Sequence, residues 1–158
     1  MSADKQCLPR IILDTNCYVE LLTAHDEDKA RAVRDLVEGH KKNHEVILPE
    51  IVRLETLAVA SKGRNGEDGG LKEKREDNFN KIKDWLWGKK FLFTDFRNCS
   101  SSVEDAIFEY GLKAPDAIIF ATAKDYRAQL FTYDSDLLQL NGECGVEVAQ
   151  PPASQMLI

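Results

Sequence analysis

The chain lacks several features that would assign it to a familiar class. Its apolar runs are far shorter than the roughly 20 residues that cross a bilayer, and residues 1–7 lack the basic-then-apolar pattern of a signal peptide. It contains no G-x-x-x-x-G-K-[ST] and no G-x-S-x-G motif, which are the central features of P-loop NTPases and α/β-hydrolases. We therefore expect a cytoplasmic protein with no membrane association and neither of those chemistries.

Cysteine and basic charge are also scarce. The four cysteines, Cys7, Cys17, Cys99 and Cys144, lie far apart and form no C-x-x-C pair, so we expect reduced thiols. The net charge of −6 argues against a protein that coats nucleic acid by bulk electrostatics. It does not exclude an enzyme that acts on nucleic acid, because bound metal ions would invert the local field that a phosphate feels.

The chain is long enough, and at 43% hydrophobic residues apolar enough, to build one core of ordinary size. Short β-rich runs alternate with stretches of helical periodicity. We expect strands near residues 11–13, 46–48, 91–94, 129–133 and 146–148, and helices near 18–22, 28–42, 49–61, 71–87, 102–110, 116–126 and 135–140. This alternation predicts a three-layer α/β/α sandwich with a mostly parallel central sheet. The domain would span residues 1–150, followed by a C-terminal tail at 151–158.

Four carboxylates stand at the edges of apolar runs: Asp14, Glu55, Asp116 and Asp134. Removing a carboxylate from water is costly unless it is paired, protonated or bound to a metal. Ligands collect at the carboxyl ends of parallel strands, where Asp14 and Asp134 are expected. The pattern therefore predicts one shared cation site, and a donor set made only of oxygen suits Mg²⁺ or Mn²⁺ better than zinc.

Glu55 is the most informative of the four. Its helical neighbours Ile51, Ala58 and Val59 are apolar, which places the carboxylate on an apolar helix face. Simpler explanations exist for each acid alone: an aspartate at a helix start is a common N-cap, and Glu55 could pair with a nearby arginine. Chance caps would not be expected to share one edge of a sheet.

The order of these motifs resembles that of the PIN domain. The matching segments are Leu13-Asp14-Thr15-Asn16, the lone glutamate on a helix, Tyr110-Gly111-Leu112 leading into Asp116-Ala117-Ile118-Ile119-Phe120-Ala121-Thr122-Ala123, and Leu130-Phe131-Thr132-Tyr133-Asp134-Ser135-Asp136. The resemblance covers residues 11–148.

The resemblance implies a metal-dependent endoribonuclease in which one or two Mg²⁺ or Mn²⁺ ions assist hydrolysis of RNA. The implied catalytic and metal-binding residues are Asp14, Glu55, Asp116 and Asp134. Spacing alone leaves open whether Asp134 or Asp136 is the fourth ligand. Asn16 and Thr132 match positions that often support the site.

A compact single domain is similar to the VapC-like toxins of toxin–antitoxin pairs. Such a toxin would form a homodimer and bind a small antitoxin protein whose tail enters the acidic groove. A housekeeping RNA-processing PIN nuclease would look the same, and a non-catalytic PIN-like module that binds RNA or protein is a further alternative. A Mg²⁺-dependent phosphatase would need a second aspartate where Asn16 stands.

Three other signals are weaker. His40 and His44 lie four residues apart but lack the glutamate of H-E-x-x-H, so zinc is not expected there. The charged stretch 62–76 is either solvated surface or an RNA-binding rim, and the glycines in its first part, residues 62–70, indicate a loop. Trp87 is expected to be exposed, available for stacking or for a partner, as is the apolar tail at 156–158.

Overall fold

The computed structural model of this chain describes residues 7–62 and 72–154. Its centre is one five-stranded sheet with the strand order β3-β2-β1-β4-β5, in which every neighbouring pair is parallel. The strands are β1 (Arg10–Leu13), β2 (Glu45–Pro49), β3 (Leu92–Thr94), β4 (Gln129–Phe131) and β5 (Val148–Ala149). The sheet is therefore wholly parallel, where the sequence predicted a mostly parallel one.

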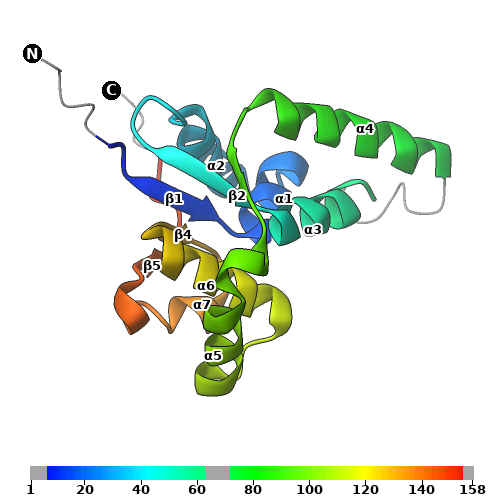
Figure 1. Cartoon of the computed structure of the whole chain (residues 1–158). Helices are drawn as coiled ribbons and strands as arrows, with labels where there is room; N and C mark the ends of the chain where they lie inside the picture. The colour runs from blue at the N-terminus through cyan, green and yellow to red at the C-terminus, as the bar shows by residue number, and fades with distance from the viewer. Residues whose placement is uncertain (1–6, 63–71, 155–158) are drawn as a thin grey trace, which may run out of the picture.

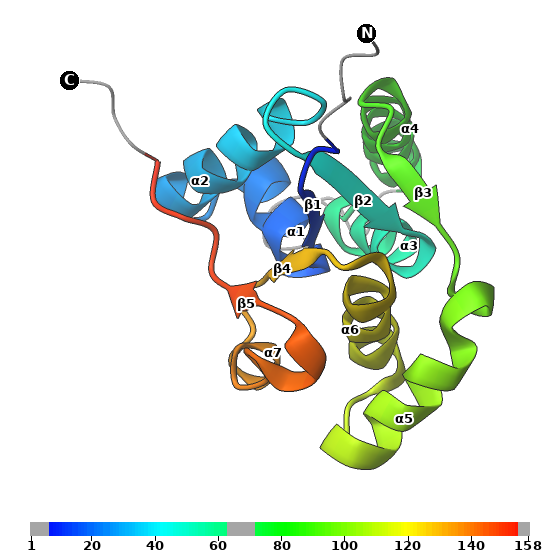
Figure 2. The same ribbon diagram turned by 60° about the vertical axis from the view of Figure 1, so that its left-hand side comes forward.

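Helices connect consecutive strands and lie on both sides of the sheet (Figures 1 and 2). They are α1 (Thr15–Thr23), α2 (Glu27–Glu38), α3 (Glu50–Ala60), α4 (Lys72–Gly88), α5 (Ser100–Tyr110), α6 (Ala114–Tyr126) and α7 (Ser135–Leu138), with short 3₁₀ turns at Phe96–Cys99 and Glu143–Gly145. None of the helices in the described ranges is both long and apolar enough to cross a membrane.

The central strands are covered on both faces. In β1, Ile11, Ile12 and Leu13 are all buried although successive side chains point to opposite faces, and β2 is buried from Val46 to Pro49. Parallel strands buried on both faces read as continuous apolar runs, which is how they appear in the sequence. The expected α/β/α sandwich is confirmed.

The strand order places β1 and β4 at the point where the sheet reverses its direction of growth. From β1 the chain moves outward to β2 and β3, and then returns to add β4 and β5 on the other side of β1 (Figure 2). Leu13 pairs with Phe131 at the carboxyl ends of these two strands. In open α/β sheets this is where ligand sites form.

Several helix boundaries differ from the sequence prediction, among them those of α2 and α5. Helix α2 ends at Glu38 with Gly39 as its C-cap, rather than near Lys42. Helix α5 begins at Ser100 rather than after Ser102, because the 3₁₀ turn at Phe96–Cys99 runs directly into it. The Ser102 hydroxyl is not a cap and instead donates to Asp125 Oδ1 at 3.0 Å.

The other differences are small. Pro49 is the N-cap of α3 rather than its first residue. Strand β4 ends at Phe131, two residues early, and β5 begins at Val148 rather than Val146. These shifts leave the order of elements unchanged.

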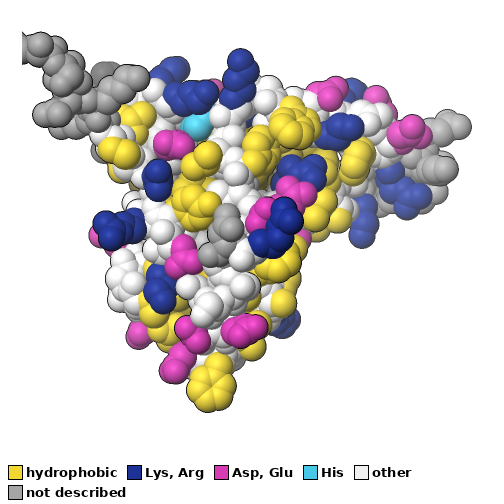
Figure 3. All heavy atoms as spheres, viewed as in Figure 1, with side chains coloured by type: hydrophobic (Ala, Val, Ile, Leu, Met, Phe, Trp, Pro, Cys, Tyr) yellow, Lys and Arg dark blue, Asp and Glu magenta, His cyan; other side chains and the backbone are white. Residues whose placement is uncertain are grey.

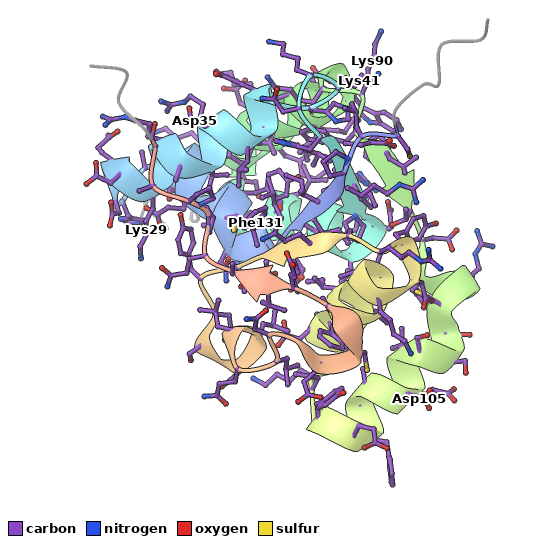
Figure 4. The ribbon with its side chains drawn as sticks, turned by 90° about the vertical axis from the view of Figure 1, so that its left-hand side faces the viewer. Lys29, Asp35, Lys41, Lys90, Asp105 and Phe131 are labelled. Atoms are coloured by element: carbon purple, nitrogen blue, oxygen red, sulfur yellow. The ribbon has the colours of Figure 1, made fainter. Side chains whose placement is uncertain are left out.

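The described part of the C-terminal tail docks on α2 (Figure 4). Pro151 is buried, and the Ser154 hydroxyl donates to Asp35 Oδ2 at 2.5 Å. The expected loop at residues 62–70, apart from Lys62, and the apolar tail at 156–158 lie outside the described residues.

Candidate active site

Asp14 follows β1 and is the N-cap of α1, buried with 5% of its surface exposed. Its Oδ1 accepts a hydrogen bond from the Thr15 backbone N–H at 2.7 Å. Its Oδ2 accepts from the Thr132 hydroxyl at 2.7 Å and from Asn16 Nδ2 at 3.2 Å. Three donors therefore fix the orientation of this carboxylate.

Asn16 and Thr132 link the ends of β1 and β4. Asn16 Oδ1 accepts from the Tyr133 backbone N–H at 3.2 Å, and Thr132 Oγ1 accepts from the Asp134 backbone N–H at 2.9 Å. The Asn16 amide also lies 3.2 Å from Thr132 Oγ1. Both residues that the resemblance placed in supporting positions thus contact Asp14 directly.

Glu55 reaches the same region from α3. Its Oε1 accepts a hydrogen bond from the Thr15 hydroxyl at 3.0 Å. The apolar helix face expected around Glu55 is only partly covered, because Ile51 packs against the core whereas Ala58 is exposed and Val59 is 47% exposed. Helix α3 buries a different side, with Val52, Thr56 and Leu57, and leaves the apolar face around Glu55 open.

The alternative that Glu55 pairs with an arginine is not supported. Arg53, its nearest arginine on α3, binds Glu50 with Nη2 2.6 Å and Nε 3.0 Å from the two carboxylate oxygens. In the described parts of the chain, the hydrogen bond from Thr15 is the one that the Glu55 carboxylate makes.

Asp116 lies in the first turn of α6 and is half-buried. The backbone of Lys113 forms the N-cap there, so Asp116 does not serve as the cap. Burial raises the pKa of Asp116, the charges of Asp134 and Glu55 raise it further, and the charge of Lys113 lowers it. Asp116 therefore lies within electrostatic reach of acids from two other elements.

Asp134 and Asp136 follow β4 at the start of α7. Asp134 is the N-cap, with Oδ1 accepting from the Asp136 backbone N–H at 2.8 Å. Asp134 is half-buried, whereas Asp136 is exposed. The Asp134 charge raises the pKa of both Asp14 and Asp116, while that of Asp136 acts, more weakly, on Asp116. Asp134 thus lies deeper in the group.

We call Asp14, Glu55, Asp116, Asp134 and Asp136 the acidic cluster. Burial raises the pKa of Asp14 to about 6, opposed by hydrogen bonds from Thr132 and Thr15 and assisted by the charges of Asp116 and Asp134. Capping and clustering therefore coexist, since Asp14 and Asp134 both cap helices and both belong to the cluster.

The donor set of the cluster fits a hard divalent cation. All donors are carboxylate oxygens. Burial, and to a lesser extent the repulsion between the acids, raises the pKa of Asp14 and Asp116, and a bound cation would offset both effects. Within residues 7–62 and 72–154, however, no group of three or more Asp, Glu, His or Cys side chains is already arranged to hold an ion. The carboxylates converge without forming a closed coordination shell.

The histidine pair does not form a site. His40 Nδ1 accepts from the Val46 backbone N–H at 2.9 Å, and its Nε2 lies 3.0 Å from the Lys90 carbonyl oxygen. His44 Nε2 lies 2.6 Å from the Leu36 carbonyl oxygen. These rings hold the turn between α2 and β2. All four cysteines are free thiols, as expected.

Residues 11–143 match the family model of the PIN domain. The chain belongs to the PIN-domain family. PIN domains are generally nucleases and generally use divalent metal ions. No curated protein gives a significant sequence match.

Solved structures of low sequence identity share this PIN fold. A toxin–antitoxin complex from Klebsiella pneumoniae is 22% identical with a TM-score of 0.62, covering 91% of this chain and 99% of that one. VapBC2 from Rickettsia felis, bound to a DNA fragment from its promoter, is 20% identical with a TM-score of 0.61, covering 89% and 98%. FitAcB from Neisseria gonorrhoeae is 21% identical with a TM-score of 0.63, covering 89% and 97%.

Two residues beside the acidic cluster escaped the sequence analysis. Thr15 is bonded to both Asp14 and Glu55, and Lys113 places a positive charge near Asp116. Thr15 stands directly after the strand-end aspartate, which is a weak signal. Nothing in the sequence indicates that its hydroxyl reaches a helix 40 residues further along.

Proposed function

We propose that this PIN domain is a metal-dependent endoribonuclease that hydrolyses RNA phosphodiester bonds, and that it is the toxin of a toxin–antitoxin pair. One observation carries the proposal. Asp14 is fixed at the switch point of the sheet by three hydrogen bonds, and burial, assisted by the charges of Asp116 and Asp134, raises its pKa to about 6. Converging carboxylates at that place in the fold favour cation binding.

Asp14, Glu55, Asp116 and Asp134 would hold Mg²⁺ or Mn²⁺ and serve as the catalytic residues. When bound, such an ion supplies activation of a water and charge stabilisation at the phosphodiester. We assign the fourth position to Asp134 rather than Asp136, because Asp134 is half-buried and acts on Asp14 as well as Asp116. Asp136 would lie at the margin.

The chain's own residues orient the reacting groups. Thr132 and Asn16 hold Asp14 in one orientation, so that its position need not change when a cation enters. Lys113 is exposed at the start of α6 and brings positive charge to the edge of the acidic cluster. It is placed to attract a substrate phosphate that the acids alone would repel.

The toxin assignment is supported by the solved toxin–antitoxin complexes that share the fold and by the open apolar face beside Glu55. Leu54 is 48% and Val59 47% exposed on α3, and Trp87 on α4 is 57% exposed. Hydrophobic side chains also gather over α4 and β3 in the view of Figure 3. An antitoxin segment that pairs apolar residues with a basic one would cover this face and neutralise the acidic cluster.

A homodimer is part of the proposal. On α5, Phe108 is 87% exposed beside the partly exposed Ile107, which offers an apolar surface for a second copy. Sedimentation of the wild type and of Phe108→Asp tests this point. A dimer that the substitution converts to a monomer is expected, and a monomeric wild type would contradict it.

RNA cleavage with and without Mn²⁺ tests the enzymatic proposal. We expect wild-type protein to cut single-stranded RNA only with Mn²⁺ or Mg²⁺, and Asp116→Asn to be inactive. Asp105→Asn is the matched control, because Asp105 is exposed on α5, far from the carboxyl ends of β1 and β4 (Figure 4). Equal cleavage by Asp116→Asn and wild type would contradict the mechanism. Wild-type protein that cuts no RNA would favour a binding module.

A further inference from the structure

Thr15 contacts two carboxylates that come from different elements. Its backbone N–H donates to Asp14 Oδ1 at 2.7 Å, and its hydroxyl donates to Glu55 Oε1 at 3.0 Å. Asp14 lies directly after β1, at the N-cap of α1. Glu55 belongs to α3, which packs against α1. One residue thus ties the fixed carboxylate to the distant one.

The hydrogen bond from Thr15 restricts Glu55 more than Asp14, because Glu55 is otherwise less constrained. Its longer side chain has three rotatable torsions, and its surroundings on α3 are open at Ala58 and Val59. Among the residues that the structure describes, the Thr15 hydroxyl is the one donor to its carboxylate. Without this hydrogen bond, Glu55 would sample several rotamers. Binding a cation would then cost the conformational entropy of fixing one of them.

Thr15 itself is well held. It is the first residue of α1, where Asp14 satisfies its backbone N–H, one of the donors that a helix start leaves unpaired. Its β-branched side chain has few χ1 rotamers in a helix, which limits the directions in which the hydroxyl can point. The hydrogen bond occupies Oε1 and leaves Oε2 of Glu55 free to bind an ion.

We propose that Thr15 is a positioning residue, whose hydroxyl holds the Glu55 carboxylate in place for a divalent cation and so joins Glu55 to the site built around Asp14. This inference rests on the proposed metal-dependent function. It concerns an outer contact of a ligand, and such contacts commonly orient the ligand and strengthen metal binding.

Calorimetric titration of Mn²⁺ into the metal-free full chain tests it. Thr15→Val keeps the shape of the side chain and removes the hydroxyl, and we expect about 10- to 100-fold weaker Mn²⁺ binding. Thr15→Ser keeps the hydroxyl and should bind within about threefold of wild type on the same scale. Equal affinities for Thr15→Val and wild type would overturn the inference.

Thr23→Val is the matched control. It makes the same change in the same helix, where the Thr23 hydroxyl donates to the Val19 carbonyl oxygen at 2.8 Å, away from the acidic cluster. We expect unchanged Mn²⁺ affinity. Loss of Mn²⁺ binding by Thr23→Val equal to that of Thr15→Val would assign the effect to α1 as a whole and overturn the positioning role.

A double-mutant cycle separates positioning from general damage. In the Glu55→Ala background, Thr15→Val should change Mn²⁺ affinity no further, because the partner of its hydroxyl is gone. A further loss as large as that seen in the wild-type background would overturn the inference. The melting temperature of each variant, measured without metal, shows whether the fold is intact.

The outcomes also separate this inference from the proposed function. Mn²⁺ binding that depends on Thr15, in a protein that cuts no RNA, would support the positioning role and overturn the nuclease. RNA cleavage and Mn²⁺ binding that are both unchanged in Thr15→Val would support the nuclease and overturn the positioning role. A wild-type protein that binds no Mn²⁺ would overturn both.

Discussion

The two halves of the acidic cluster are held very differently. Around Asp14 the site is buried, and its carboxylate accepts three hydrogen bonds, from the Thr15 backbone and the Asn16 side chain of α1 and from the Thr132 hydroxyl after β4. Around Glu55 it is open, with one hydrogen bond and exposed apolar neighbours. Burial and hydrogen bonds thus build a rigid half, which would orient the proposed cation, beside an open half, which would face the proposed substrate and partner.

The largest expected effect comes from removing the rigid half. Asp14→Asn should lower RNA cleavage by more than about 100-fold, since even outer contacts of a metal ligand are worth 10- to 100-fold. Glu55→Gln should cost about tenfold less than that, because Glu55 is held by one contact. Single-turnover cleavage at saturating Mn²⁺ measures both. Equal losses of cleavage in Asp14→Asn and Glu55→Gln would contradict the distinction between the rigid and the open half.

The link between β1 and β4 gives the next effect. Thr132→Val removes the hydroxyl that donates to Asp14 and accepts from the Asp134 backbone N–H. We expect the free energy of unfolding to fall by about 1–3 kcal/mol, because buried partners lose their hydrogen bonds. Cleavage should fall about 10- to 100-fold. Urea unfolding and the same cleavage assay check it, with Thr132→Ser as the control that should retain both properties.

These effects bear on how much the sequence could predict. Apolar runs and helical periodicity were enough for the strand and helix order, and the strand-end positions of Asp14 and Asp134 were enough to expect a shared site. The exposure of Ala58 and Val59 beside Glu55 was missed, because periodicity shows that these residues share a face with Ile51 but not how much of that face the core covers. The helix expected near residues 102–110 starts earlier, at Ser100, because the 3₁₀ turn at Phe96–Cys99 runs directly into it, and periodicity does not reveal such a turn.

The rigid half also predicts a pH dependence. The pKa of Asp14 is raised to about 6, so a proton competes with a cation there, and Mn²⁺ binding should weaken about tenfold from pH 7 to pH 5. Calorimetry across this range measures it. An affinity that is constant over these two pH values would show that Asp14 is not a ligand.

The same pKa has a consequence for stability without metal. A folded pKa of about 6, above the unfolded value near 3.9, means that this contribution is present at low pH and lost as the pH rises through 6. The stability of wild type relative to Asp14→Asn should therefore fall by about 2 kcal/mol between pH 4 and pH 7. Denaturant unfolding of both proteins checks the sign. If the stability of wild type relative to Asp14→Asn rose with pH instead, the folded protein would not raise the pKa of Asp14.

The smallest effect is expected on the open half. Leu54→Ser should change the free energy of unfolding by less than about 0.5 kcal/mol and leave cleavage unaltered, because Leu54 is 48% exposed. It should weaken capture of an antitoxin, if one is encoded beside this chain. A substantial loss of stability would mean that α3 is packed more tightly than its exposed face indicates.

The central claim is that one divalent cation site joins β1, α3, α6 and the end of β4. Anomalous diffraction from a crystal of the full chain soaked in Mn²⁺ tests it most directly. We expect a peak at the oxygens of Asp14 and Asp116, with Asp134 closer to the ion than Asp136. A Mn²⁺ ion bound elsewhere, or no peak at Asp14 in a soak at millimolar Mn²⁺, would contradict the account.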